Sequence, residues 1–215
     1  VRMANAIDET DAMVRRRIGF AGDPRLLENI RTSWLEQLRK ADTIRDIGRL
    51  RKATIKAIEA QQIDMPKHPI RVGVVGEFFT VMDPFSNHDI ERELARMGVL
   101  VDRWMDISNC LYHYRSRKML PRIKDYAHYD MGATAMGTID AALRYARSGF
   151  DGIVHVKSSG CTPEIDAIPA LQNISADYHI PILYLSFDTQ TSETGLNTRL
   201  EAFYDMISMR KQQRR

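Results

Sequence analysis

The chain is poor in cysteine, has no long apolar run and carries almost balanced charge. Only two of its 215 residues are cysteines, Cys110 and Cys161, which are too few for a disulfide framework or for a complete cysteine-ligated metal site. No stretch approaches the roughly 18–20 apolar residues of a membrane span, and the first residues lack the apolar core of a secretion signal. These absences argue against a transmembrane or disulfide-stapled protein and predict a cytoplasmic one.

The charge of the chain gives no sign of a polyanionic partner. With 31 basic and 28 acidic residues, the net charge is +3, so we expect neither a nucleic acid nor a membrane surface as a partner. The first residue is Val1 rather than methionine, and Met3 lies in what reads as a continuing helix. We therefore expect the sequence to be a piece of a longer or processed protein.

Residues 1–66 are predicted to be helical throughout. Asp23 and Pro24 form a helix start, after which apolar residues recur every three or four positions through residue 38. A second stripe of this kind runs from residue 44 to residue 58. The basic side chains of this part alternate with acidic ones, which predicts a solvated helix face. These basic residues are Arg15, Arg16, Arg17, Arg49, Arg51 and Lys52.

The pattern changes at Pro66 and Pro69, which break the helical periodicity. We therefore divide the chain into a helical segment, residues 1–66, and an α/β lobe, residues 67–215. Short apolar runs in the lobe predict strands at residues 70–77, 99–105, 152–158 and 181–187. Strands separated by helices imply right-handed crossovers. The predicted fold is a parallel four-stranded sheet with flanking helices on both faces.

Helices are predicted between these strands and at the end of the chain. Asn87 and Gly98 mark the start and the end of the first. An extra helix is expected near residues 111–124, and a longer one between residues 132 and 148. An apolar stripe predicts the last helix, formed by Leu196, Leu200, Phe203 and Ile207.

The loops that follow the strands are the expected place for a ligand, because open parallel sheets bind ligands at the carboxyl ends of their strands. In one of these loops Gly160 permits a tight turn, and Cys161 precedes a helix start at Thr162 and Pro163. Free N–H groups at a helix N-terminus stabilise a thiolate, which suits metal binding, nucleophilic attack or redox chemistry. An inert, half-buried thiol explains the same residues equally well.

Two neighbours of Cys161 bear on this choice. The carboxylate of Glu164 should raise the pKa of the thiol. Pro169 either kinks a helix that begins at Pro163 or marks the true start of that helix. At the end of the first strand, Glu77 is a candidate acid, base or ligand, or else a hydrogen-bond acceptor that holds the adjacent loop.

Other positions carry weaker signals. Cys110 is predicted to be structural, and His155, inside the third strand, is predicted to pack or hydrogen-bond within the sheet. Gly132 and Gly137 have the spacing of a phosphate loop, but no lysine follows and no strand precedes them. We therefore predict no phosphate loop there.

Three ordered blocks of the sequence resemble proteins related to 2-hydroxyacyl-CoA dehydratases and their activases. The blocks are RVGVVGEFFTVMDPFSNHDIERELARMGV, GATAMGTIDAALRYARSGFDGIVHVKSSGCTPEI and IPILYLSFDTQTSETGLNTRLEAFYDMI. They are similar to the family's Val-Gly-(x)-Val-Gly-Glu segment, its Gly-Cys-Met-Pro-Glu loop and its Thr-Arg-(x)-Glu-Ala-Phe run. The resemblance covers residues 70–207 and corresponds to the C-terminal part of the double-cubane cluster type.

This resemblance implies a flavodoxin-like lobe of a low-potential iron–sulfur protein. In the family, cysteines from separate lobes hold a 4Fe–4S or double-cubane cluster, and an ATP-hydrolysing activase supplies single electrons. The reactions are difficult reductions or the radical elimination of water from a 2-hydroxyacyl-CoA. By position, Cys161 matches a cluster ligand and Gly160 stands beside it. Glu77 and Arg199 match motif positions that line or support the site.

The chain departs from the family around this cysteine, since it reads Ser-Ser-Gly-Cys-Thr where Pro-Phe-Gly-Cys-Met is usual. An iron–sulfur cluster needs about four ligands. The expected source of the others is a further lobe N-terminal to Val1, so this chain by itself should hold no complete cluster. The rival hypotheses are a cluster-less docking or regulatory α/β module, and a binder of a small ligand such as a CoA ester at the strand ends.

Overall fold

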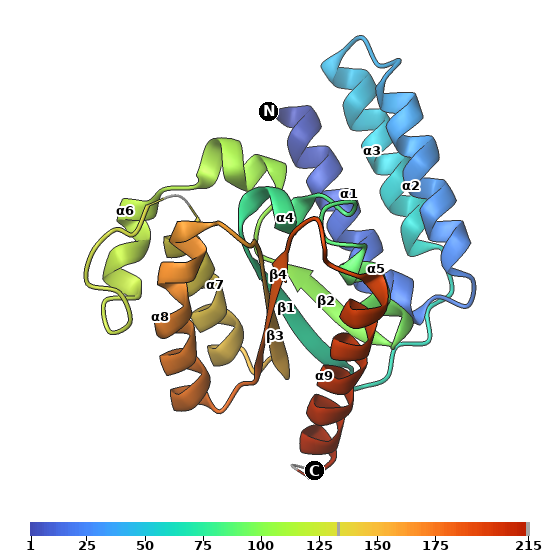
Figure 1. The fold of residues 1–215 in the computed structure, drawn as a ribbon. Coiled ribbons are helices and arrows are strands. Elements are labelled where there is room, and N and C mark those ends of the chain that lie inside the picture. The colour runs from blue at the N-terminus through green and yellow to red at the C-terminus, as the bar shows by residue number, and fades with distance from the viewer. Residues whose placement is uncertain (133, 214–215) are drawn as a thin grey trace.

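The computed structural model describes residues 1–132 and 134–213 and shows a helical segment beside an α/β lobe (Figure 1). The helical segment consists of α1 (Arg2–Arg17), the 3-10 turn η1 (Ile18–Phe20), α2 (Pro24–Leu38) and α3 (Ile44–Glu59). Asp23 caps α2 by accepting a hydrogen bond from the Arg25 N–H at 3.0 Å. Thr43 caps α3 in the same way. Both caps satisfy N–H groups that a helix start leaves unpaired, and the predicted helices of this segment are confirmed.

Four parallel strands form the sheet: β1 (Ile70–Gly76), β2 (Val99–Arg103), β3 (Gly152–Ser158) and β4 (Ile182–Phe187). Their order across the sheet is β2-β1-β3-β4. Valine and isoleucine dominate the buried positions of β1 and β3, as expected of central strands covered on both faces. The predicted flavodoxin-like α/β fold is confirmed, and each predicted strand agrees with its observed bounds to within one or two residues.

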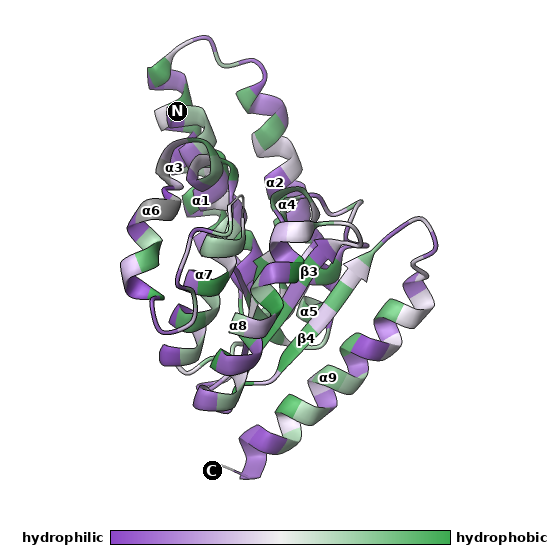
Figure 2. Ribbon diagram, turned by 60° about the vertical axis from the view of Figure 1, so that its left-hand side comes forward, coloured by the Kyte–Doolittle hydropathy of each residue, from purple (hydrophilic) through white to green (hydrophobic). Residues whose placement is uncertain are grey.

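Helices cover both faces of this sheet. On one face α7 (Ala135–Arg147) and α8 (Thr162–Tyr178) pack side by side, and on the other lie α5 (Ile90–Arg96) and α9 (Glu193–Gln213) (Figure 1). Hydrophobic and hydrophilic residues alternate along α9 (Figure 2). Its predicted stripe is the buried one, formed by Leu196, Leu200, Phe203 and Ile207.

The single helix predicted near residues 111–124 is wrong. The segment forms three short pieces instead: the π-helical turn η2 (Asn109–His113), α6 (Ser116–Met119) and the 3-10 turn η3 (Leu120–Arg122). The backbone of Tyr114 is extended and ends the first piece. Pro121 has no N–H for the hydrogen bond that a continuing α-helix would require, so the third piece stays short.

The lobe and the helical segment have separate apolar cores. One continuous cluster of buried residues fills the lobe on both sides of β1 and β3. The helical segment has two small clusters, one around Trp34 and one around Leu27. Within the described part of the chain, no buried residue of the helical segment belongs to the lobe's cluster.

Polar contacts join the two parts at a junction formed by α1 and η1 on one side and by β2 and α5 on the other. Arg16 pairs with Asp102 at 2.7 Å. The buried carboxylate of Asp8 accepts hydrogen bonds from the N–H and the hydroxyl of Ser108 at 2.7 and 2.5 Å. Because buried carboxylates need such partners, this contact fixes α1 against the segment that follows β2.

The prediction of a solvated face is wrong for Arg15. Its side chain is only 9% exposed and lies 3.6 Å from the carboxylate of Glu91, because α1 packs against the lobe. The prediction holds for Arg49, which is 78% exposed on α3. None of the helices in the described ranges is both long and apolar enough to cross a bilayer.

Candidate functional site

The strand order of the sheet reverses at β1 and β3, whose carboxyl ends lie next to each other. The chain runs outward from β1 to β2 and then returns to the other side of β1 as β3, and ligands bind at such reversals in open α/β sheets. Glu77 follows β1, and its N–H donates to the carbonyl of Val156 in β3 at 3.0 Å. Cys161 follows β3. The structure therefore brings two of the predicted site residues, Glu77 and Cys161, to the same edge of the sheet.

Cys161 is the N-cap residue of α8 and is partly exposed at this edge. Its N–H donates to the Ser158 carbonyl at 3.2 Å, which closes a turn at the end of β3. The prediction that Thr162 caps the helix is wrong, since Thr162 is already its first residue. The turn also does not require glycine. A β-carbon on Gly160 would meet nothing within 4 Å, and its backbone is not left-handed.

Of the two alternatives for Pro169, an early helix start is correct. α8 begins at Thr162 and runs through Pro169 to Tyr178. Pro163 lies in the first turn, where its missing N–H costs nothing. The helix therefore presents its N-terminal end directly beneath Cys161.

Burial raises the pKa of the Cys161 thiol above its ordinary value. The Glu164 N–H at the start of α8 lowers this pKa, whereas the carboxylates of Glu164 and Glu77 raise it and the ammonium of Lys157 lowers it. The predicted stabilisation of the thiolate by the helix N-terminus is therefore outweighed by burial, while the predicted effect of Glu164 is confirmed. The net effect disfavours the thiolate form of Cys161.

Glu164 anchors the Cys161 loop to the sheet, a role that the sequence analysis did not find. Its side chain is fully buried, and one oxygen lies 2.8 Å from His155 Nε2 in β3. The other oxygen accepts hydrogen bonds from the hydroxyls of Thr134 and Thr138. A buried carboxylate with three partners fixes the start of α8 against β3, because its own oxygens would otherwise be left unsatisfied. His155 is predicted to pack or hydrogen-bond within the sheet; its hydrogen-bond partner is instead Glu164 of α8.

Lys157 is a second residue that the sequence analysis missed. Although it belongs to β3, its side chain turns to the strand end and donates to the carbonyls of Ser158 and Ser159 at 3.3 and 3.1 Å. It is only 6% exposed. A cation held in this way offsets the negative charge of the neighbouring carboxylates at this edge of the sheet.

The remaining candidates have structural contacts. The carboxylate of Glu77 caps the short helix α4 (Phe78–Met82) by accepting from the N–H groups of Phe79 and Thr80 at 3.0 and 3.1 Å, as the loop-holding alternative predicted. Arg199 donates to the Tyr184 carbonyl at 2.6 Å. Cys110 is partly buried against the lobe's core, and burial raises the pKa of its thiol.

Five exposed apolar side chains lie in segments that follow strands or begin α8. We call this set the apolar rim; it consists of Phe79, Phe85, Ile107, Leu111 and Ile165. Phe79 and Phe85 follow β1, and Ile107 and Leu111 follow β2. Ile165 lies in the first turn of α8. Phe85 is 91% exposed and Phe79 is 64% exposed. Rings left in water at one edge are typical of a surface that another polypeptide covers.

The donor groups at this edge do not make a complete metal site. In residues 1–132 and 134–213, no three side chains of the His, Cys, Asp and Glu types gather closely enough to hold a metal ion. Cys161 can supply one thiolate ligand, and its nearest ionisable neighbours are already used in caps and buried hydrogen bonds.

The chain also matches the model of a known protein family. The family model described as 2-hydroxyglutaryl-CoA dehydratase, D-component, matches residues 72–207, a span that runs from β1 into α9 and includes the Cys161 loop. Among curated proteins, none matches the chain closely enough to count as a relative. Because the family model covers more than half of the chain and all four strands, the chain belongs to the family of the 2-hydroxyglutaryl-CoA dehydratase D-component.

Proposed function

We propose that the chain is a lobe of a 2-hydroxyacyl-CoA dehydratase-like or reductase-like iron–sulfur component, in which Cys161 supplies one cluster ligand. The observation that carries this proposal is the position of the thiol, which is partly exposed at the strand-order reversal on a loop anchored by a buried carboxylate. Membership of the dehydratase family supports the reaction class. An ATP-dependent activase is the proposed electron donor, and an acyl-CoA is the proposed substrate.

The ligand count requires a partner. A cluster takes about four ligands, and the described edge offers one thiol. We place the other cysteines on a second lobe that docks on the apolar rim, because a dry, covered edge excludes water from a low-potential centre. When bound, the cluster supplies single low-potential electrons to the bound acyl-CoA.

The residues of this chain hold and tune the ligand. Glu164 and His155 fix the loop. Lys157 and the N–H groups of α8 favour a negative sulfur, against the burial that raises the pKa of Cys161. Iron binding requires loss of the thiol proton, so the raised pKa makes cluster loading weaker at low pH than at high pH.

The competing function is a cluster-less docking or regulatory module. The apolar rim supports docking whether or not a metal is held, and the raised pKa of the Cys161 thiol suits a structural cysteine. The two functions differ in the iron content of the intact protein.

A pair of cysteine variants tests the proposal. We expect anaerobically prepared full-length protein to lose most of its iron and its cluster absorbance with Cys161→Ser and to keep both with Cys110→Ser. Circular dichroism should show the same fold for both variants. Equal iron in the two variants would refute ligation by Cys161, and an iron-free wild-type protein would favour the docking module.

The chain of residues 1–215 by itself provides a second measurement. Reconstitution with iron and sulfide should yield no stoichiometric cluster, because the remaining ligands belong to the partner lobe. A full cluster on this chain would contradict the proposed division of ligands.

A further inference from the structure

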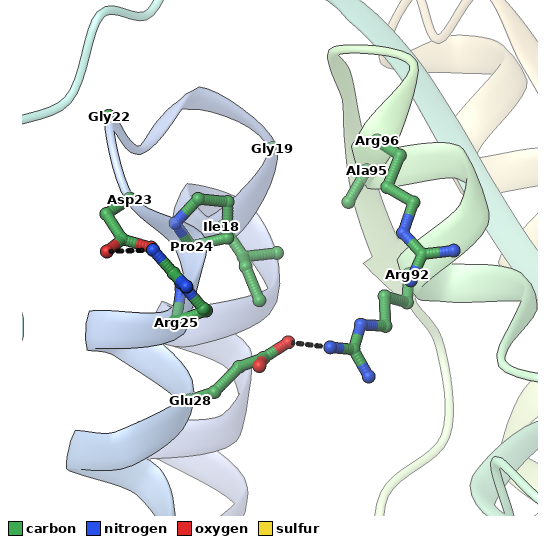
Figure 3. A pocket seen from close by; sticks show the side chains of 10 residues that line it. All are labelled: Ile18, Gly19, Gly22, Asp23, Pro24, Arg25, Glu28, Arg92, Ala95 and Arg96. Carbon is green, nitrogen blue, oxygen red and sulfur yellow. Dashed lines mark hydrogen bonds and ion pairs between the residues drawn. The ribbon is translucent and has the colours of Figure 1, made fainter.

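A cavity of about 650 Å³ opens at the junction of the helical segment and the lobe, away from the Cys161 edge (Figure 3). One wall is formed by η1 and the start of α2, with Ile18 and Pro24, and the other by α5. Its volume falls in the range of small-molecule pockets, which occur preferentially between packing units. The proposed dehydratase chemistry makes no use of it.

Two arginines of α5, Arg92 and Arg96, supply guanidinium groups to the wall of the cavity. Arg92 and Arg96 are one helical turn apart and extend from the same side of α5 (Figure 3), so their like charges repel. Arg92 reaches across the gap to Glu28 on α2, with an N–O distance of 2.6 Å. Arg96 pairs with Glu93 of its own helix. On the opposite wall Arg25 is engaged with the Asp23 cap.

The ion pair between Glu28 and Arg92 joins the two walls of the cavity. A guanidinium group has five N–H donors in a planar fork. The Glu28 carboxylate engages one nitrogen of Arg92 at 2.6 Å, and the Asp89 carboxylate lies 3.7 Å from another. The side chains of Glu28 and Arg92 are 31% and 43% exposed, so both remain accessible from the open side. A free dianion with oxygens on several sides can engage the guanidinium groups of Arg92 and Arg96 together. The carboxylate of Glu28 engages that of Arg92.

We propose that this cavity binds a phosphorylated small molecule, with its phosphoryl group on Arg92 and Arg96 and its apolar part against Ile18 and Pro24. Tetrahedral phosphate offers the oxygens and the double charge that two neighbouring guanidinium groups match. The phosphoryl group competes with Glu28 and Asp89 for Arg92, and with Glu93 for Arg96. The ligand therefore contacts both the helical segment and the lobe, and it stabilises their junction.

Calorimetric titration of the full chain with inorganic pyrophosphate tests this site. We expect saturable binding with one pyrophosphate per chain, and a loss of about tenfold or more in affinity for Arg92→Ala and for Arg96→Ala. Arg49→Ala, on an exposed ion-paired arginine of α3, is the matched control and should leave the affinity unchanged.

Glu28→Gln gives the sharper result, because a folding defect does not produce it. Removal of the competing carboxylate should strengthen pyrophosphate binding several-fold. Absence of saturable binding, an unchanged affinity in Glu28→Gln, or an equal loss in Arg49→Ala would each overturn the proposal. Equal binding of malonate would overturn the phosphoryl assignment.

Discussion

The helical segment and the α/β lobe are stabilised in different ways. The lobe has one continuous apolar core that covers both faces of the sheet. The helical segment has two small clusters, each with three buried side chains, and meets the lobe through ion pairs and a buried carboxylate. Because apolar burial contributes more stability than exposed ion pairs, the lobe should be the more stable unit.

This difference bears on function. The Cys161 loop stands on the rigid lobe, with Glu164 fastened to a central strand. The cavity proposed to bind a phosphoryl group lies at the junction of the two parts, where a bound ligand can strengthen the association of the helical segment with the lobe. Substitutions in each part should therefore have distinct and separable effects.

The largest effect is expected for Gly76→Ala, at the end of β1. Gly76 has a φ of +138°, and a β-carbon there would lie 1.8 Å from the Val156 carbonyl oxygen. Strain and overpacking together should lower the unfolding free energy by about 4 kcal/mol. Gly98→Ala is the control, because Gly98 also has a positive φ but has open space around it. Equal urea midpoints for the two variants would contradict this account.

Leu171→Ala and Leu27→Ala compare the two cores directly. Both leucines are completely buried, one in the lobe and the other in the helical segment. Each change should cost about 3 kcal/mol locally. We expect hydrogen exchange to accelerate throughout residues 70–213 in the first variant and only within residues 1–66 in the second. Uniform acceleration in both would show that the two parts unfold as one unit.

Glu164→Ala should cost about 2 kcal/mol, because it leaves His155 and the hydroxyl of Thr134 without their buried acceptor. It should also increase the rate at which Cys161 reacts with iodoacetamide, since the loop loses its anchor. Asp166→Ala, on an exposed position of the same helix, should change neither stability nor alkylation. An unchanged alkylation rate in Glu164→Ala would show that the buried hydrogen bonds of Glu164 do not control the reactivity of the Cys161 thiol.

Alkaline pH should weaken the lobe selectively, because all eight tyrosines lie outside the helical segment. Burial raises the pKa of Tyr184 to about 12, whereas an unfolded tyrosine titrates near 10. The folded state therefore loses stability as the pH rises from about 10 to about 12. Tyr184→Phe should lose less stability than the wild type between pH 9 and pH 11 in urea titrations. An equal loss of stability in the two proteins over this pH range would show that Tyr184 does not cause the alkaline destabilisation.

The smallest effect is expected at the junction pair Arg16 and Asp102. Arg16 is half exposed, so a double-mutant cycle with Arg16→Gln and Asp102→Asn should give a coupling below about 1 kcal/mol, and less in concentrated salt. A larger, salt-independent coupling would mean that the junction is as rigid as the lobe.

Much of the fold follows from sequence periodicity, whereas the environment of the site does not. The strands and the α9 stripe repeat hydrophobic residues at regular intervals, and both were predicted correctly. The network of Glu164 joins residues that are 9 to 30 positions apart along the chain, so no local pattern reports it. The burial that raises the pKa of Cys161 is likewise a tertiary property.

The same reasoning explains the errors. Arg15 alternates with acidic residues as a solvated side chain would, yet packing of α1 on the lobe buries it. The segment near Pro121 has helix-forming residues, but the proline interrupts the hydrogen bonds. In both cases the decisive contact or missing donor outweighs the local propensity.

The position of β1 inside the sheet also determines when its strand pairing can be completed during synthesis. β1 pairs with β3 as well as β2, and β3 ends 82 residues after β1 does. At ribosomal speeds this delay is about 4 to 16 s, during which one edge of an apolar strand has no neighbour. The helices α1, α2 and α3 precede β1 in the chain and therefore leave the ribosome before it.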